Sequence, residues 1–185
     1  KRSHPDLSYI KDTFLQINKF LRLNQVLILE STSYPGTTEE IFVKKLKSKF
    51  HIGKNFFIGF SSERINPGQN ENKLYQIPKV ISGYSKNCLR LLSSIYSLVF
   101  KKIVGAKDLK SAEFSKLLEN IYRSVNIGFI NEMKIVADNM GLDIFEIIEI
   151  ANTKPYGFRK FNPGPGVGGH CIPIDPEYLY WKSSQ

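Results

Sequence analysis

The stretch Gln25-Val-Leu-Ile-Leu-Glu30 is a short, continuous apolar run bounded by polar residues. Such a run is typical of a β-strand that is buried on both faces of its sheet. Asn55-Phe-Phe-Ile-Gly-Phe60 repeats the pattern, and residues 37–50 between the two runs have the apolar spacing of a helix, with Thr37 or Thr38 as its cap. Further strands are expected over 79–82 and 101–104, and further helices over 7–21, capped by Asp6, and over 89–99. Strands that alternate with helices at this spacing predict an α/β fold with a parallel sheet and crossover helices.

Polar turns follow the two strongest predicted strands, after Glu30 and after Phe60. In a parallel sheet, ligands bind outside the carboxyl ends of the strands, so both turns are placed for binding. Thr32, in the first turn, could offer a hydroxyl to a ligand or cap the turn. Glu63 and Arg64, in the second turn, could handle a proton and an anion, or they could form an exposed ion pair of little energetic value.

Residues 109–140 have apolar side chains at helical spacing and contain no proline. They predict a helix of about thirty residues, well beyond the usual length. Its apolar residues cover more than one face, which favours burial between two domains or in a subunit interface. Lys116 and Asn120 are four residues apart on this helix and share a face. The pattern fits a partnered, buried lysine and equally a lysine that extends to solvent. Shorter helices are expected over 143–151 and from Pro176 onward.

The composition narrows the class of protein. Hydrophobic residues make up 42% and charged residues 23% of the chain, as in ordinary globular proteins. The net charge of +9 comes from scattered basic residues without the interleaved aromatic residues of a nucleic-acid groove, so we expect no nucleic-acid partner. No apolar run approaches the ~18 residues that span a bilayer, so we expect no membrane partner. The two cysteines do not make a disulfide framework, which favours a reducing, cytoplasmic environment.

A glycine-rich loop with one thiol lies near the end of the chain, Asn162-Pro-Gly-Pro-Gly-Val-Gly-Gly-His-Cys-Ile-Pro-Ile-Asp-Pro176. A cysteine on such a tightly bent loop is a candidate nucleophile, and the alternative is a surface loop with an incidental cysteine. Residues 164–169 look like a dinucleotide-binding fingerprint, but they follow no predicted strand and so lack its context. Neither the histidines nor Cys171 have metal-ligand spacing, so no metal is expected.

Five stretches, in order along the chain, resemble the UDP-glucose/GDP-mannose dehydrogenase family, whose members oxidise a sugar C6 alcohol to a carboxylate. They are Pro5-Asp-Leu-Ser-Tyr-Ile10, Glu30-Ser-Thr-Ser-Tyr-Pro-Gly-Thr-Thr38, Ser62-Glu-Arg-Ile-Asn-Pro-Gly68, Lys116-Leu-Leu-Glu-Asn-Ile-Tyr-Arg-Ser-Val-Asn-Ile127 and the glycine-rich loop. Thr153-Lys-Pro-Tyr-Gly-Phe158, together with the residues around Cys171, is most similar to the branch that acts on UDP-N-acetylglucosamine or its mannosamine and galactosamine epimers.

The resemblance implies a role for each of five catalytic residues. Cys171 would be the nucleophile that captures the C6 aldehyde as a thiohemiacetal, which a second oxidation converts to a thioester. Lys116, Asn120 and Asp175 would handle the C6 oxygen and an ordered water, with Lys116 stabilising the oxyanion and Asp175 taking part in proton transfer. Glu63 would assist acid–base steps, including hydrolysis of the thioester. A thiolate adds readily to an aldehyde, and an oxyanion needs preorganised donors, so these roles are chemically coherent.

The resemblance also implies a cofactor and a substrate. The cofactor would be NAD, with Ser31 and Thr32 beside its nicotinamide half. The substrate would be a UDP-sugar held by the backbone of residues 161–169. The substrate-binding residues implied are Glu63, Arg64, Lys116, Asn120, Phe161, Gly164, Gly166 and Gly168.

The domain organisation that the resemblance implies is a partial one. Residues 1–106 would form the second, C-terminal half of a Rossmann-like NAD-binding domain, and residues 107–185 a central helical domain with the cysteine loop. The pyrophosphate fingerprint would precede residue 1, and the domain that closes over the nucleotide would follow Gln185. We therefore expect an inactive fragment, a homodimer through the long helix, of a cytoplasmic enzyme that supplies capsule or O-antigen polysaccharide. The alternative is a non-catalytic remnant or dimerisation module of the same fold.

Overall fold

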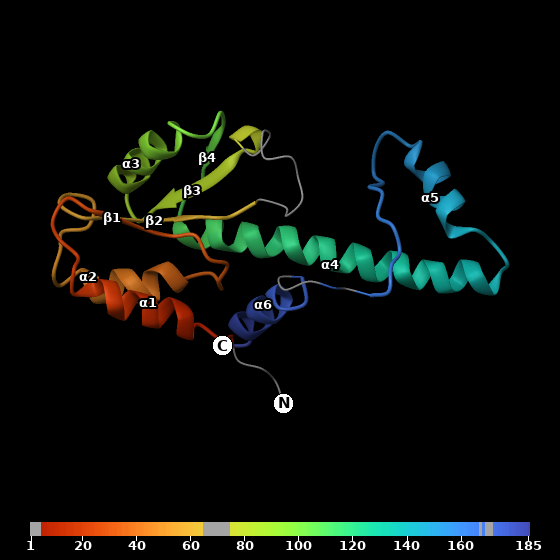
Figure 1. The fold of residues 1–185 in the computed structure, drawn as a ribbon, viewed down its shortest axis with the longest axis horizontal. Helices are drawn as coiled ribbons and strands as arrows, with labels where there is room; N and C mark the ends of the chain where they lie inside the picture. The colour runs from red at the N-terminus through yellow and green to blue at the C-terminus, as the bar shows by residue number, and fades with distance from the viewer. Residues whose placement is uncertain (1–4, 65–74, 167, 169–171) are drawn as a thin grey trace. The chain divides into compact units, whose positions relative to one another are not determined.

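The structure is a computed structural model that describes residues 5–64, 75–166, 168 and 172–185. The chain forms two compact units, Lys1–Leu117 with Glu177–Gln185, and Leu118–Pro176; Figure 1 shows the fold. The strands are β1 (Val26–Leu29), β2 (Phe57–Ser61), β3 (Lys79–Gly83) and β4 (Ile103–Gly105). The helices are α1 (Ser8–Asn18), the π-helical turn η1 (Glu39–Val43) that continues into α2 (Lys44–Leu46), α3 (Lys86–Tyr96), α4 (Leu109–Asn139), α5 (Ile144–Asn152) and α6 (Asp175–Ser183).

The four strands form one sheet in the order β1-β2-β3-β4, which confirms the predicted α/β class. The prediction of a parallel sheet is wrong for one pair, because β2 and β3 are antiparallel, with Ser61 opposite Ile81. The pairs β1–β2 and β3–β4 are parallel. A parallel neighbour needs a crossover connection, usually a helix, whereas an antiparallel neighbour does not. The polar sequence after Ser61 offers no apolar helix face, so β3 returns beside β2 in the opposite direction.

Helices cover both faces of the sheet in the first unit. Figure 1 shows α3 on one side of the strands and α1 with α2 on the other. Alternate residues of β2 explain this, since Ile58 and Phe60 belong to a buried cluster with residues of α1 and η1. On the other face, a Cβ added at Gly59 would lie 2.2 Å from Leu92 of α3. The glycine therefore allows α3 to pack closely against the sheet.

Side chains near the helix starts test the predicted caps. The prediction that Asp6 is the N-cap of the first helix is wrong, because Leu7 holds that position in α1 without a capping side-chain bond; Asp6 precedes it and accepts from the N–H of Ser8 at 2.9 Å. Asp143, for which no cap was predicted, caps α5, since its carboxylate accepts from the N–H of Phe145. The prediction that Thr37 or Thr38 caps the next helix is confirmed for the position of Thr38 but not for its side chain. Thr38 occupies the N-cap position of η1 without a capping side-chain bond, and the Thr37 hydroxyl donates instead to the carbonyl of Tyr34. An acceptor from a distant part of the chain takes the capping role.

The long helix is confirmed, since α4 has 31 residues. In the second unit, its later turns pack against α5 through a buried cluster of Ile130, Ala137, Ile144 and Ile148. Other apolar side chains of α4 remain exposed in the single chain, among them Leu118 at 55% and Val125 at 64%. Among the described residues, no helix has the length and apolar character needed to cross a membrane.

Candidate active site

The carboxyl ends of β1 and β2 lie at the same edge of the sheet, because the two strands are parallel and Leu29 pairs with Phe60. The turns that follow these strands, with Ser31 and Thr32 after β1 and Glu63 and Arg64 after β2, therefore start from one edge, as the sequence predicted. Because β3 is antiparallel to β2, it begins at this edge. Its first residue, Lys79, brings a cation to the predicted ligand-binding edge.

Lys79 is a buried cation that joins the ends of β1 and β2. Its side chain is 5% exposed, and its ammonium lies 3.4 Å from Glu30 and 3.4 Å from Glu63. The ammonium also lies over the rings of Tyr96 and Phe100, at 5.5 Å and 5.4 Å from their centroids. A buried ammonium is costly without partners, and two carboxylates with two ring faces provide them. Lys79 thus fixes one of the predicted catalytic carboxylates, Glu63, against the sheet.

Two neighbours complete this arrangement. The hydroxyl of Tyr96 donates to Glu30 at 2.5 Å, and burial, followed by this carboxylate, raises the pKa of Tyr96. Arg64 donates from its backbone N–H to Glu63 at 2.7 Å and from its guanidinium to the carbonyl of Pro78 at 3.1 Å. The guanidinium is thus held near the start of β3, and the Glu63 carboxylate is held by a backbone donor and a lysine.

The turn after β1 runs from solvent into the core. Ser31 is exposed and Thr32 half-buried, whereas Ser33 is 1% exposed. Ser62, directly after β2, is also 1% exposed. Within the described part of the chain, neither the Ser33 nor the Ser62 hydroxyl has a hydrogen-bond partner. Buried hydroxyls normally find partners, so this edge fits a polar ligand such as a dinucleotide.

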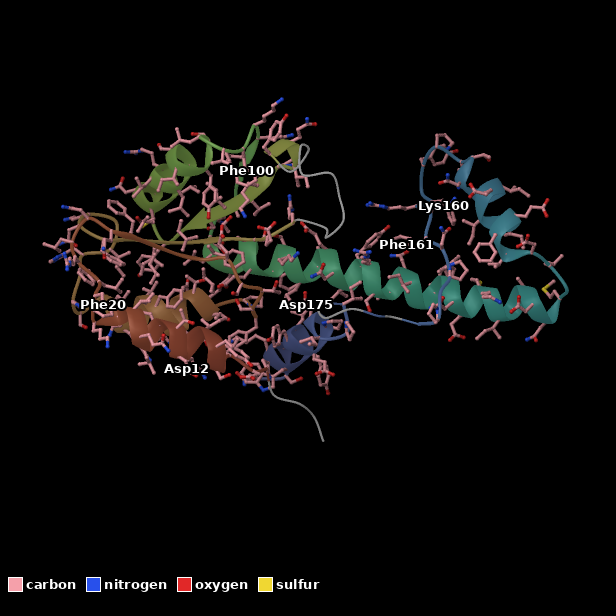
Figure 2. All side chains as sticks on the ribbon, in the orientation of Figure 1. Asp12, Phe20, Phe100, Lys160, Phe161 and Asp175 are labelled. Atoms are coloured by element: carbon pink, nitrogen blue, oxygen red, sulfur yellow. The ribbon has the colours of Figure 1, made fainter. Side chains whose placement is uncertain are left out.

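Two more of the predicted residues, Asn120 and Asp175, lie in the second unit. The amide Nδ2 of Asn120 donates to Oδ2 of Asp175 at 2.5 Å, and Asp175 is 3% exposed at the N-terminal end of α6 (Figure 2). The structure therefore brings together two of the five predicted catalytic residues, which are 55 positions apart in sequence. Lys116, one turn before Asn120 on α4, is half-buried. Cys171 lies outside the described residues.

The glycine-rich loop is tied to α4 by its backbone. The N–H of Gly164 donates to the side-chain oxygen of Asn131 at 2.9 Å. The ring of Phe161 packs edge-on against Tyr122, with centroids 6.2 Å apart (Figure 2). Gly166 has a φ of +141°, a conformation that favours glycine. Gly168, like Gly164 and Gly166, is exposed, and a Cβ at any of these three would meet no atom of the described residues within 4 Å. The backbone at these three glycines is open to a ligand.

Sequence reasoning missed three residues that organise these sites. The sequence offered a signal for Lys79, because this lysine starts an apolar predicted strand, where a buried cation needs partners. Asn131 was visible as a polar residue on the long helix, but its partner is in a loop 33 residues away. Glu113, a fully buried carboxylate in the first turns of α4, had no signal in the sequence pattern. Its partners, Gly36 and Thr38, are at least 75 residues away.

Metal ligation has no support in the described part of the chain, where no group of three or more histidine, cysteine, aspartate or glutamate side chains could hold a metal ion.

Comparison with solved structures defines the class of fold. A UDP-D-ManNAc dehydrogenase from Pyrococcus horikoshii superimposes with a TM-score of 0.91 at 33% identity, over 98% of this chain and 43% of that one. A UDP-N-acetyl-mannosamine dehydrogenase from Staphylococcus aureus, Cap5O, gives 0.80 at 34% identity, over 96% of this chain and 43% of that one. The fold is that of a nucleotide-sugar dehydrogenase.

Comparison with models of protein families identifies the family. The NAD binding domain of the UDP-glucose/GDP-mannose dehydrogenase family matches residues 1–100, and its central domain matches residues 110–185. The chain belongs to the UDP-glucose/GDP-mannose dehydrogenase family, which confirms the resemblance. A UDP-N-acetyl-D-glucosamine 6-dehydrogenase from Pseudomonas aeruginosa is 39% identical over 99% of this chain and 44% of its own length. A UDP-N-acetyl-D-mannosamine dehydrogenase from Methanocaldococcus jannaschii is 36% identical over 96% of this chain and 40% of its own length. The chain thus spans less than half of these relatives.

Proposed function

We propose that the protein oxidises the C6 hydroxyl of a UDP-N-acetylhexosamine to a uronic acid in two NAD-dependent steps and supplies a polysaccharide pathway in the cytoplasm. The proposal rests on the family, on relatives whose names give this substrate class, and on the predicted site residues. The observation that carries it is the hydrogen bond from Asn120 to Asp175, because it joins two implied catalytic residues from distant parts of the sequence.

NAD, when bound, accepts a hydride in each of the two oxidations. We propose that Ser31 and Thr32, at the carboxyl end of β1, lie beside its nicotinamide half. The buried hydroxyls of Ser33 and Ser62 at the same edge support a polar ligand there. Residues 1–106 would then contribute to the NAD-binding domain, and residues 107–185 to the central domain.

The chain's own residues account for the remaining chemistry. The Cys171 thiolate adds to the C6 aldehyde, forming a carbon–sulfur bond, and the oxygen becomes a thiohemiacetal alkoxide. Lys116 and Asn120 stabilise negative charge on that oxygen. Once the thiohemiacetal has been oxidised to the thioester, water attacks the carbonyl carbon and the carbon–sulfur bond breaks, which releases the carboxylate and the thiol. Glu63 and Asp175 move the protons that this hydrolysis requires.

The substrate is proposed to bind along the glycine-rich loop. The open backbone of Gly164, Gly166 and Gly168 would approach the sugar nucleotide closely, with Phe161 beside it. Arg64 and Glu63, at the end of β2, would contribute an anion-binding group and a carboxylate. The basic character of the chain, with a net charge of +9, favours an anionic substrate.

We further propose a homodimer through the long helix. Val125 and Phe129 lie one helical turn apart on α4, and they are 64% and 56% exposed in the single chain. Beside Phe129, α4 and α5 form an apolar groove of about 290 Å³ whose lining includes Met133 and Ile147. A second copy would cover these apolar side chains. Sedimentation should give twice the monomer mass, and Val125→Glu should reduce it; a wild-type monomer would contradict the dimer.

A second candidate function is a non-catalytic remnant that keeps the dimerising helix. The observation that favours it is the exposed apolar surface of α4, which a dimer would bury without any cofactor. The two candidates differ in a direct assay. NADH formation from a panel of UDP-sugars, including the N-acetylglucosamine, N-acetylmannosamine and N-acetylgalactosamine epimers, should identify one oxidised substrate for the full-length gene product. Failure to oxidise any of these UDP-sugars would leave the non-catalytic remnant as the better account of the protein.

A further inference from the structure

Glu113 is a fully buried carboxylate that accepts, among the described residues, from donors of one turn. It lies in the first turns of α4 with a relative exposure of 0%. Its Oε2 accepts from the N–H of Gly36 at 2.5 Å. Its Oε1 accepts from the N–H of Thr38 at 2.9 Å and from the Thr38 hydroxyl at 2.7 Å. One side chain of the long helix therefore holds three donors of the turn that follows β1.

The burial of Glu113 is costly, so its position needs an explanation. Burying a carboxylate is tolerated when hydrogen bonds satisfy it. Here the donors include the N–H of Thr38, the N-cap residue of η1, where a helix leaves its first N–H groups without intrahelical partners. An exposed local cap such as serine would satisfy a helix start at much lower cost. The sequence instead uses an acceptor 75 residues away, which ties two elements together.

The turn that Glu113 holds is also stabilised by hydrogen bonds among nearby residues. The Thr37 hydroxyl donates to the Tyr34 carbonyl at 2.7 Å, and the Tyr34 hydroxyl donates to Glu40 at 2.8 Å. Gly36 has a φ of +102°, and its N–H approaches the Glu113 carboxylate closely. The turn is thus a fixed structure, and Glu113 is its link to α4.

We propose that Glu113 is a positioning residue that fixes the turn carrying Ser31 and Thr32 to the helix carrying Lys116, and so prepares the nicotinamide end of the dinucleotide site. The inference rests on the proposed function. Glu113 and Lys116 are three residues apart on α4 and share a face of that helix. A carboxylate that holds the turn therefore sets the position of the turn relative to the lysine. A loop that is ordered before binding loses less freedom when the cofactor arrives.

The variant Glu113→Gln tests this in the full-length gene product. Glutamine keeps the size of the side chain, but its amide NH₂ replaces one acceptor and faces an N–H donor. Small displacements of positioned groups can cost up to about 100-fold in rate. We expect kcat/KM for NAD to fall by about 10- to 100-fold. We expect the KM for the UDP-sugar to change by less than about twofold, because uniform binding of the sugar is untouched. Glu132→Gln, an exposed carboxylate on the same helix, is the matched control and should change neither.

Two further measurements separate positioning from loss of the fold. Thr38→Val removes only the hydroxyl donor and keeps both backbone bonds, so it should fold and lower kcat/KM for NAD by less than Glu113→Gln does. Hydrogen exchange should show the amides of Gly36 and Thr38 protected in the wild type. Kinetics of Glu113→Gln equal to those of Glu132→Gln, or fast exchange of both amides in the wild type, would overturn the inference. If the wild type oxidises no UDP-sugar, the proposed function fails. The NAD affinities of Glu113→Gln and Glu132→Gln, measured by calorimetry, then test the Glu113 inference separately, and equal affinities would overturn it.

Discussion

Asn120 Nδ2 donates to Asp175 Oδ2 at 2.5 Å, which orients both side chains across 55 residues of sequence. A carboxylate with 3% exposure retains a fixed direction when an amide donates to it. Lys116 lies one turn earlier on the same face of α4 as Asn120. This pairing gives the proposed catalytic roles of Asn120 and Asp175 a structural basis that neither residue has alone.

Replacement of Asn120 should therefore reduce activity far more than it reduces stability. Asn120→Ala removes a donor to the buried Asp175 and the proposed donor to the developing oxyanion. We expect kcat to fall by about 10²–10³, the loss seen when one oxyanion donor is removed. The control is Asn126→Ala on the same helix, a partly exposed residue whose amide donates to the backbone carbonyl of Tyr122. Steady-state kinetics of the full-length gene product should show a change of less than about twofold for the control; equal losses for the two variants would contradict the role of Asn120.

Lys79 should contribute to stability through its two carboxylate partners. Lys79→Met leaves Glu30 and Glu63 without their shared cation. Breaking a fully buried pair costs about 3–5 kcal/mol, but both carboxylates are half-exposed, so we expect a loss of about 1–3 kcal/mol. Lys134→Met is the matched control, because its pair with Asp138 on α4 is exposed on both sides and should be worth about 0.5 kcal/mol or less. Calorimetry compares the two variants, and an equal effect would show that Lys79 is not a structural cation.

Two glycines should respond to alanine in opposite directions. A Cβ at Gly83, at the end of β3, would lie 2.2 Å from the backbone nitrogen of Leu89, so Gly83→Ala must push α3 from the sheet. We expect a loss of about 1–3 kcal/mol or more from this overpacking. A Cβ at Gly128 on α4 would meet no atom of the described part of the chain within 4 Å, and Gly128→Ala should stabilise the helix by about 0.5–1 kcal/mol. Tolerance of alanine at residue 83 would mean that α3 packs less closely than the structure shows.

The pH dependence of stability should carry a signature of Glu113. Burial raises the pKa of Glu113, while donors from Thr38 and Gly36 lower it and the nearby Glu39, which pairs with Lys110, raises it. A carboxyl with a raised folded-state pKa binds more protons when folded, so stability falls as the pH rises from about 4.3 through the raised pKa. The free energy of unfolding of the wild type minus that of Glu113→Gln should fall across this range. A difference that is constant or rises with pH would contradict the direction of the shift.

The sequence predicted the elements whose signals are local. The apolar run 25–30 and the helical spacing over 109–140 use residues close together in the chain, so their patterns were sufficient. The edge that carries Glu63 also followed from them, because the carboxyl ends of parallel strands meet. Non-local pairing was not accessible: the antiparallel direction of β3 depends on how a polar connection returns. In the same way, Thr38 looked like a cap until Glu113 supplied the acceptor from α4.

The candidate site divides along the same line. Residue types in the motifs identified Asn120 and Asp175, but only the fold shows that they are hydrogen-bonded. Lys79 and Asn131 organise Glu63 and the loop backbone at Gly164, and their roles depend on partners that are 16 and 33 positions away. Cys171 lies outside the described residues, so its role remains a prediction from the motif.

The number of NADH molecules formed per UDP-N-acetylhexosamine consumed by the full-length gene product tests the central claim most directly. The proposed sequence of alcohol, aldehyde, thioester and acid requires two NADH per sugar, and Cys171→Ser should abolish this stoichiometry because no thioester can form. A wild-type ratio of one, or an unchanged ratio of two with an unchanged rate in Cys171→Ser, would contradict the two-step oxidation through Cys171.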